Sequence, residues 1–79
     1  MNSDYKKLAQ IAYDTVLQTM MEGEKTHTAD EWKQITIGGH SYCALRHIDE
    51  FNKGDKSEDH IAHALTRCAM IKYLEDERK

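Results

Sequence analysis

The sequence predicts a small all-α domain, and three observations support that fold class. The 79-residue chain contains no proline, the residue that most disrupts a helix. It is rich in Ala, Leu, Glu and Lys, which favour helices, and its apolar residues recur at helical spacing. Only residues 34–37 alternate as a β-strand would. We expect a single four-helix domain over residues 1–79, ending in an antiparallel helical hairpin.

The first predicted helix covers residues 4–21, and Gly23 is typical of the residue that ends a helix. Apolar residues recur every four positions along it and form one stripe. The stripe consists of Leu8, Ala12, Val16 and Met20.

A short second helix should follow a polar loop. Residues 28–31 (Thr-Ala-Asp-Glu) match the capping box, in which a threonine caps the helix and a glutamate follows three residues later. This helix should carry Trp32. The glycine pair at 38–39 is typical of a helix break, so we expect the chain to restart after it.

The last two helices should cover residues 41–52 and 57–77, with Ser57 as the cap of the second. The loop between them is short, so they should lie side by side and antiparallel. Met70 and Leu74 project opposite the main apolar face of the final helix, which should therefore have contacts on two sides. The residues expected to be buried are Ala44, Leu45, Ile48, Phe51, Ile61, Ala64, Leu65, Cys68 and Ile71.

Composition excludes several function classes. The net charge of −3 with 32% charged residues argues against DNA binding, which needs a basic surface, and against a membrane surface. No apolar run approaches the roughly 20 residues that span a bilayer. Two cysteines without Cys-x-x-Cys spacing indicate the reducing cytoplasm. A domain this small often gains stability by association, so we expect a homo-oligomer or a bound partner.

Four residues of the hairpin could form a metal site. If the turn centres near residues 54–55, His47 and Glu50 on one helix face His60 and His63 on the other, because residues three apart project to the same side. Helical bundles build metal sites from such pairs. Imidazole and carboxylate ligands suit Zn, Fe or Mn better than Mg. Glu50 and His60 are the candidates for catalysis.

The same residues have alternative interpretations. The histidines could instead be solvated, or could hydrogen-bond or bind phosphate together with Arg46 and Arg67. Trp32 could pack against the hairpin as a core residue, or stack on a nucleotide base beside a pocket.

Residues 32–75 also carry a resemblance to a known family. The matching motifs are Trp32, residues 42–47 (Tyr-Cys-Ala-Leu-Arg-His), residues 51–55 (Phe-Asn-Lys-Gly-Asp) and residues 57–65 (Ser-Glu-Asp-His-Ile-Ala-His-Ala-Leu). They resemble the phage dATP/dGTP diphosphohydrolase N-terminal domain family, which joins an Ala-Leu-x-Arg-His helix to a His-Leu-Ala-His-Ala helix. The resemblance implies an all-helical fold in the style of the MazG-like nucleotide pyrophosphohydrolases, a phage origin and the handling of deoxynucleotides.

One departure separates the chain from the MazG-like enzymes, which hold Mg with paired carboxylate motifs on facing helices. The equivalent positions here are His47-x-x-Glu50 and His60-x-x-His63, which offer one carboxylate. We expect either a nucleotide-binding or (d)NTP-pyrophosphohydrolase-like protein with a divalent metal at these residues, or a non-enzymatic phage protein. The latter would inhibit a host protein complex or sequester a nucleotide signal. Either would work in the host cytoplasm.

Overall fold

The computed structural model describes residues 3–78, which form helices joined by turns, with no strand among them. The helices are α1 (Ser3–Gly23), α2 (Ile37–Asn52) and α3 (His60–Glu77), and a single 3₁₀ turn, η1 (Glu31–Gln34), lies between α1 and α2. The predicted all-α class is confirmed. The expected count of four helices is not supported, because the second is only the turn η1. Residues 1–2 and 79 of the predicted domain lie outside the described part.

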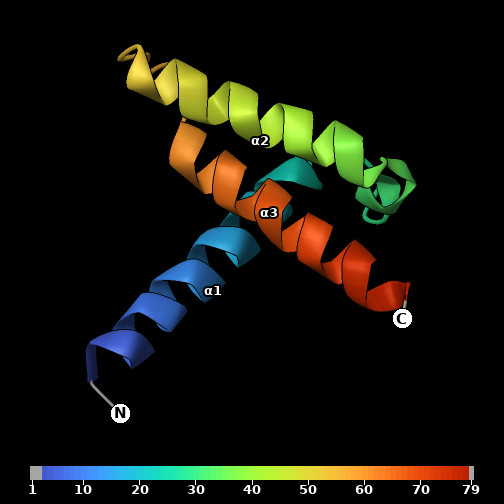
Figure 1. Ribbon diagram of the computed structural model, residues 1–79, viewed down its shortest axis with the longest axis horizontal. Helices are drawn as coiled ribbons and strands as arrows, with labels where there is room; N and C mark the ends of the chain where they lie inside the picture. Colours follow the sequence, from blue (N-terminus) through green and yellow to red (C-terminus); the bar gives the residue numbers. More distant parts are fainter. Residues whose placement is uncertain (1–2, 79) are drawn as a thin grey trace.

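The helix α3 occupies the centre of the arrangement. It packs against α2, α1 and η1, whereas α1 and α2 share no contact within the described residues. In Figure 1 the antiparallel pair α2 and α3 runs across the molecule, and the first half of α1 projects away from both. The prediction that the final helix has contacts on two sides is therefore confirmed.

The glycine pair at 38–39 does not break a helix, contrary to the prediction. Both glycines lie in the first turn of α2, where backbone N–H groups have no partner within the helix. The Thr36 side chain caps that turn by accepting a hydrogen bond from the Gly39 N–H at 3.0 Å. A side chain at Gly39 would also place its Cβ 2.9 Å from Cγ2 of Ile35, so this glycine allows a close approach.

The start of α3 also differs from the prediction, since the helix begins at His60 and not near Ser57. Asp59 is its N-cap, and its side chain accepts a hydrogen bond from the Ala62 N–H at 3.0 Å. The Ser57 hydroxyl instead donates to Asp55 at 2.7 Å. Residues 57 and 58 therefore remain in the turn before the helix.

The predicted capping box does not form. Asp30 precedes η1 without a side-chain capping bond, and Glu31 pairs with Nδ1 of His27 at 2.8 Å. Thr28 contacts Glu31 through its carbonyl oxygen, which accepts the Glu31 N–H at 3.2 Å.

The described core is small and consists of alanines and polar side chains. The buried apolar residues are Ala44, Ala62 and Ala64, and the buried polar residues are His40, His47, His60 and Thr66. The larger apolar residues expected inside are mostly outside. Those that the structure exposes are Leu45, Ile48, Phe51, Ile61 and Cys68. The α2–α3 contact is formed by alanines and imidazoles, which leaves the bulky side chains on the outer faces. None of the described helices is long and apolar enough to cross a membrane.

Candidate functional site

The turn between α2 and α3 decides which residues of the two helices meet. Gly54 has φ of +88°, in the left-handed region that glycine adopts without steric cost. The reversal brings His47 of α2 against His60 of α3, with their Nδ1 atoms 2.9 Å apart. The expected juxtaposition of these helices is thus present in the structure.

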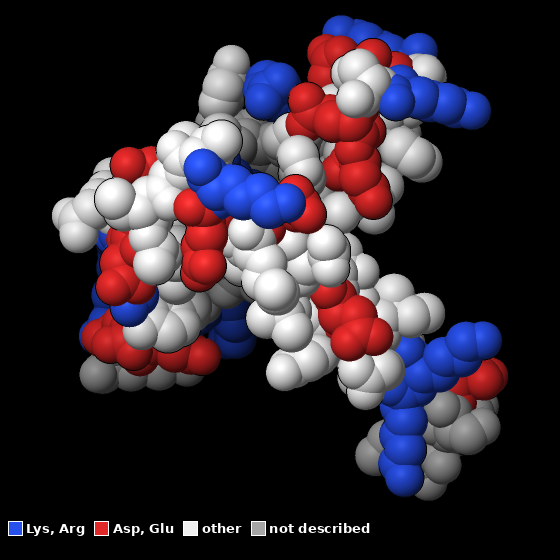
Figure 2. All heavy atoms as spheres, turned by 180° about the vertical axis from the view of Figure 1, so that it is seen from behind, with Lys and Arg blue, Asp and Glu red and all other residues white. Residues whose placement is uncertain are grey.

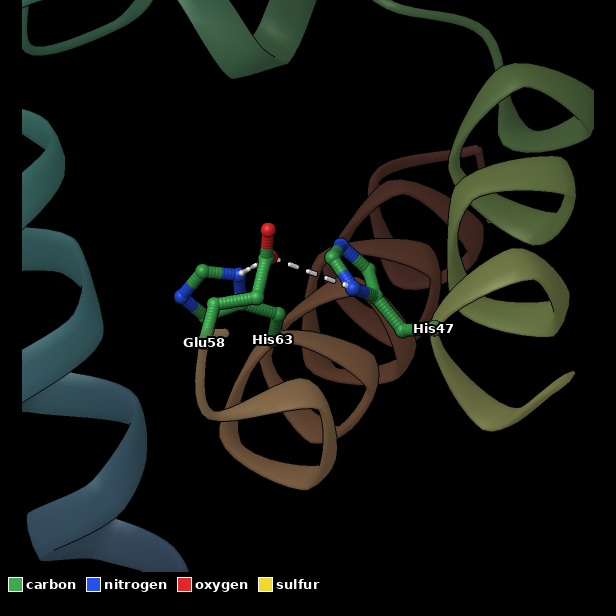
Figure 3. Close-up of side chains that lie close together, drawn as sticks. All are labelled: His47, Glu58 and His63. Atoms are coloured by element: carbon green, nitrogen blue, oxygen red, sulfur yellow. Dashed lines mark ion pairs between the residues drawn. The ribbon is translucent and has the colours of Figure 1, made fainter. Parts of the chain in front are cut away.

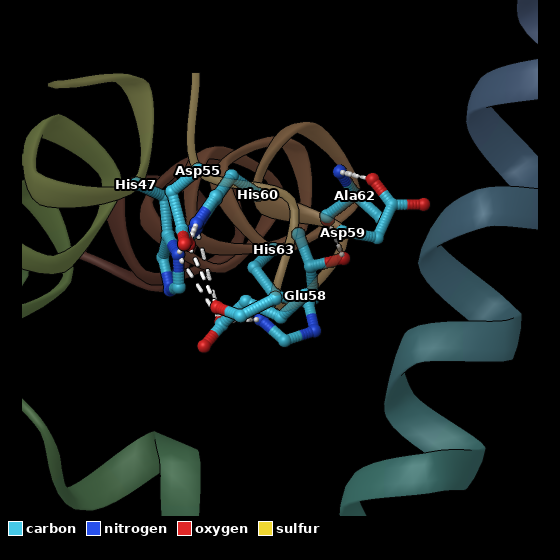
Figure 4. A network of polar contacts seen from close by, with 9 residues as sticks. His47, Asp55, Glu58, Asp59, His60, Ala62 and His63 are labelled. Carbon is cyan, nitrogen blue, oxygen red and sulfur yellow. Dashed lines mark hydrogen bonds and ion pairs between the residues drawn. The ribbon is translucent and has the colours of Figure 1, made fainter. Parts of the chain in front are cut away.

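Three histidines gather at this contact (Figure 4). The ring of His47 lies 5.2 Å from that of His60 and 5.0 Å from that of His63, measured between centroids. His47 and His60 are buried, whereas the side chain of His63 is 40% exposed. The cluster therefore has a buried side and an open side.

Asp55 holds the buried side of the cluster. Nε2–H of His60 donates to Oδ2 of Asp55 at 2.5 Å, and the Ser57 hydroxyl donates to the same oxygen. These two hydrogen bonds, that of His60 above all, lower the pKa of Asp55 from 3.8. Because His60 donates through Nε2, its Nδ1 accepts from Nδ1–H of His47.

Glu58 faces all three histidines through one carboxylate oxygen. Its Oε1 lies 2.9 Å from Nδ1 of His63, 3.5 Å from Nδ1 of His47 and 3.9 Å from Nδ1 of His60. Figure 3 shows the Glu58 side chain lying between the other two labelled rings. This placement depends on residue 58 remaining in the turn before α3.

His47, Glu58 and His63 form a group that could hold a metal ion. Each offers one ligand atom, and these atoms all lie within 4.8 Å of one another. In a tetrahedral zinc site, bonds of about 2.0–2.2 Å place the ligand atoms roughly 3.3–3.6 Å apart. Oε1 of Glu58 lies 2.9 Å from Nδ1 of His63, close to that range. His47 would offer Nε2 to the ion, because its Nδ1 donates to His60. Two imidazoles and one carboxylate suit Zn, Mn or Fe better than Mg.

Burial favours the form of His47 that binds metals. Desolvation is the main cause that lowers the pKa of His47 from 6.5, and the charge of His63 adds to it while that of Glu58 opposes it. A lowered pKa keeps the imidazole neutral at pH 7, and only a neutral imidazole has a lone pair for a metal.

A second buried network lies on the same helices. His40 is completely buried, with Nε2 2.9 Å from the Trp32 carbonyl oxygen and Nδ1 3.1 Å from Nη1 of Arg67. A guanidinium can only donate and a carbonyl can only accept, so the proton of His40 lies on Nε2. This network joins η1, α2 and α3 and fixes the position of the Arg67 guanidinium.

A cavity of about 390 Å³ lies between the end of α1, the segment after it and α3. Its lining includes Trp32, His63, Thr66 and Arg67. His63 therefore belongs both to the possible metal group and to the cavity wall. A molecule in this cavity would meet the arginine and the edge of the histidine cluster together.

Only some of the predicted site residues come together in the structure. His47, His60 and His63 come together, whereas Glu50 is directed to Lys53, with Oε1 4.0 Å from Nζ. Arg46 is exposed on α2, and its charge contributes to the lowered pKa of His47.

Trp32 combines both of its predicted environments. It is half-buried and meets Tyr73 edge-on, with the ring centroids 5.1 Å apart. It also lines the cavity beside Arg67.

Sequence reasoning missed Asp55, Glu58 and His40. The predicted helix over residues 57–77 includes Glu58 in its first turn, where the helix dipole alone explains an acid. His40 directly follows the glycine pair at which the sequence predicts a helix break. The signal for it was the spacing of His40, Ala44 and His47, which lie on one face of a continuous helix.

Comparison with known proteins gives one match. The family model described as dATP/dGTP diphosphohydrolase, N-terminal, matches residues 2–79. A search of the curated proteins and a search of the solved structures each found no match.

Proposed function

The chain belongs to the dATP/dGTP diphosphohydrolase N-terminal family, and on this premise we propose that it is a metal-assisted nucleoside triphosphate pyrophosphohydrolase-like protein. One observation carries the proposal: Glu58 lies between His47 and His63, and His63 also lines a cavity whose wall includes Arg67.

In this proposal His47, Glu58 and His63 hold a divalent metal ion, with Zn, Mn or Fe preferred. A bound ion of this kind polarises a phosphoryl oxygen and lowers the pKa of bound water. Glu58 takes the place that the sequence suggested for Glu50. Since three protein ligands leave a coordination position open, and the side chains of Glu58 and His63 are partly exposed, substrate can approach from the cavity side.

Arg67 binds the phosphates. Its guanidinium lines the cavity, and one of its nitrogens donates to His40. An arginine with an ordered guanidinium binds phosphate oxygens well, because its donors are fixed in direction. The cavity volume of about 390 Å³ lies within the 300–1,000 Å³ of typical small-molecule sites, and Trp32 offers an aromatic surface for a base.

His60 and Asp55 support the site from behind. Metal-binding histidines are commonly oriented by hydrogen bonds to a further carboxylate or polar group. Asp55 accepts from His60, and His60 accepts from His47. These hydrogen bonds fix the orientation of the His47 ring. Its other nitrogen, Nε2, takes no part in them and is the one that would bind the metal ion.

The test measures metal content and dNTP hydrolysis on the same purified protein, for the wild type, Glu58→Gln and Glu50→Gln. We expect stoichiometric metal and turnover in the wild type, loss of both in Glu58→Gln and retention of both in Glu50→Gln. The matched control removes a carboxylate that lies outside the histidine group. A folded wild type without metal or turnover would overturn the proposal. If such a protein still bound dNTP, nucleotide sequestration would replace hydrolysis.

A further inference from the structure

The guanidinium of Arg67 is held by a neutral partner. Its Nη1 donates to Nδ1 of His40 at 3.1 Å, and His40 is completely buried. Nε2–H of His40 donates to the Trp32 carbonyl oxygen at 2.9 Å, so the ring presents the lone pair of Nδ1 to Arg67. Arg67 itself is half-buried and lines the cavity. The imidazole therefore holds the arginine from the side that solvent does not reach.

No acid neutralises Arg67, although acids are near. Three glutamates line the same cavity: Glu22, Glu24 and Glu31. Within the part of the chain that the structure describes, no ion pair joins a carboxylate to Arg67. A carboxylate in the place of His40 would fix the guanidinium and also cancel its charge. A neutral imidazole fixes its direction and leaves the charge for a ligand.

The direction of this one guanidinium decides how the cavity binds an anion. Among the described residues that line the cavity, Arg67 is the one arginine or lysine. On the face shown in Figure 2, basic side chains lie in separate groups with acidic side chains among them. The chain also carries a net charge of −3. A broad basic surface, which would attract an anion from any direction, is thus missing from that face.

We propose that His40 is a positioning residue for anion binding: it holds the Arg67 guanidinium at the cavity wall and leaves the full positive charge to the phosphates of the ligand. This inference rests on the proposed role of Arg67 in binding phosphate. A long side chain that must be ordered by its ligand weakens binding by about two- to tenfold. His40 removes that cost, because the arginine is already in place.

The test is the affinity for inorganic tripolyphosphate, measured by calorimetric titration. The proteins are the wild type, His40→Leu, Arg67→Ala and the double variant, each checked for folding by circular dichroism. His40→Leu should raise the Kd by about two- to tenfold in the wild-type background. It should leave the Kd unchanged when residue 67 is already alanine, because the buried imidazole acts on the ligand through Arg67. An equal rise in both backgrounds would show a general structural effect and overturn the proposal.

His40→Gln is the matched variant, since an amide also offers one donor and one acceptor. It should bind tripolyphosphate nearly as well as the wild type, and a loss as large as that of His40→Leu would count against positioning by these two hydrogen bonds.

Glu58→Gln separates this inference from the proposed function. It disrupts the possible metal group but keeps His40 and Arg67, so the effect of His40→Leu on tripolyphosphate binding should persist in that background. That result would uphold the role of His40 even in a protein that hydrolyses no dNTP. A folded wild type that does not bind tripolyphosphate would overturn it, whether or not the protein hydrolyses dNTP.

Discussion

The Nδ1 atoms of His47 and His60 lie 2.9 Å apart in the buried contact between α2 and α3. At that distance one atom must carry a proton and the other must accept it. Because His60 already donates through Nε2 to Asp55, its Nδ1 is the acceptor of this contact and Nδ1–H of His47 is the donor. A proton on both Nδ1 atoms would leave the contact without an acceptor.

Acid should destabilise the fold through His47. Its folded pKa is below 6.5, so the unfolded chain binds the proton more tightly. The contribution of neutral His47 to the free energy of unfolding is fully present above pH 6.5. It is lost as the pH falls from there to the folded pKa of His47. The urea midpoint should fall between pH 7.5 and 5.5. His47→Gln should reduce that fall, and an unchanged pH dependence in this variant would contradict the assignment.

Removing the hydrogen bonds of His40 should destabilise the fold. His40→Leu replaces the imidazole with an apolar side chain of similar size and leaves the Trp32 carbonyl and one Arg67 nitrogen without this partner. Loss of such buried bonds costs about 1–3 kcal/mol, measurable by urea denaturation. His27→Leu is the control, since that histidine is exposed and surface changes remain within about 0.5 kcal/mol. Equal midpoints for the two variants would contradict the role of His40.

The two adjacent glycines should respond to alanine in opposite ways. At Gly38 the nearest atom to an added Cβ is 3.9 Å away, so Gly38→Ala should stabilise α2 by up to about 1 kcal/mol. At Gly39 the Cβ would lie 2.9 Å from Cγ2 of Ile35, so Gly39→Ala should destabilise by about 1 kcal/mol or more. Thermal unfolding of both variants checks the prediction. Adding Ile35→Ala should restore part of the loss at Gly39, and failure to do so would place the strain elsewhere.

Asp55→Asn should weaken metal binding without removing a ligand. An amide can still accept from His60, but it lacks the charge that holds this ring. Loss of such supporting carboxylates commonly lowers metal affinity by about 10–100-fold. Competition titration with zinc measures the change. Asp49→Asn is the control, because Asp49 pairs with the exposed Lys53 at 2.9 Å. Equal affinities for the two variants would exclude the supporting role of Asp55.

The sequence was sufficient for the fold class and for the meeting of three histidines. A short loop with its turn near residues 54–55 and the spacing of the histidines place His47, His60 and His63 together. The position of Glu58 was not predictable in the same way. Both Ser57 and Asp59 are good caps, and the choice of Asp59 depends on Ser57 binding Asp55, which in turn binds His60. That choice is made by tertiary contacts.

Burial was the least predictable feature, because hydrophobicity ranks Leu45 above His47. The structure buries the histidine and leaves the leucine 70% exposed. Small alanines such as Ala44 and Ala64 form the contact of α2 with α3, and the imidazoles beside them are buried with hydrogen-bond partners. A single sequence therefore predicts which residues share a helix face more reliably than it predicts which face is inside.

The isolation of α1 from α2 has a consequence for how the chain opens. Since α1 contacts only α3 among the described helices, it can detach while the α2–α3 hairpin and its histidines stay together. The amide protons in its first turns should exchange with solvent through this local opening, and those of the hairpin only through more extensive unfolding. Stability in the described part of the chain is thus divided into two units, and among its helices α3 alone belongs to both.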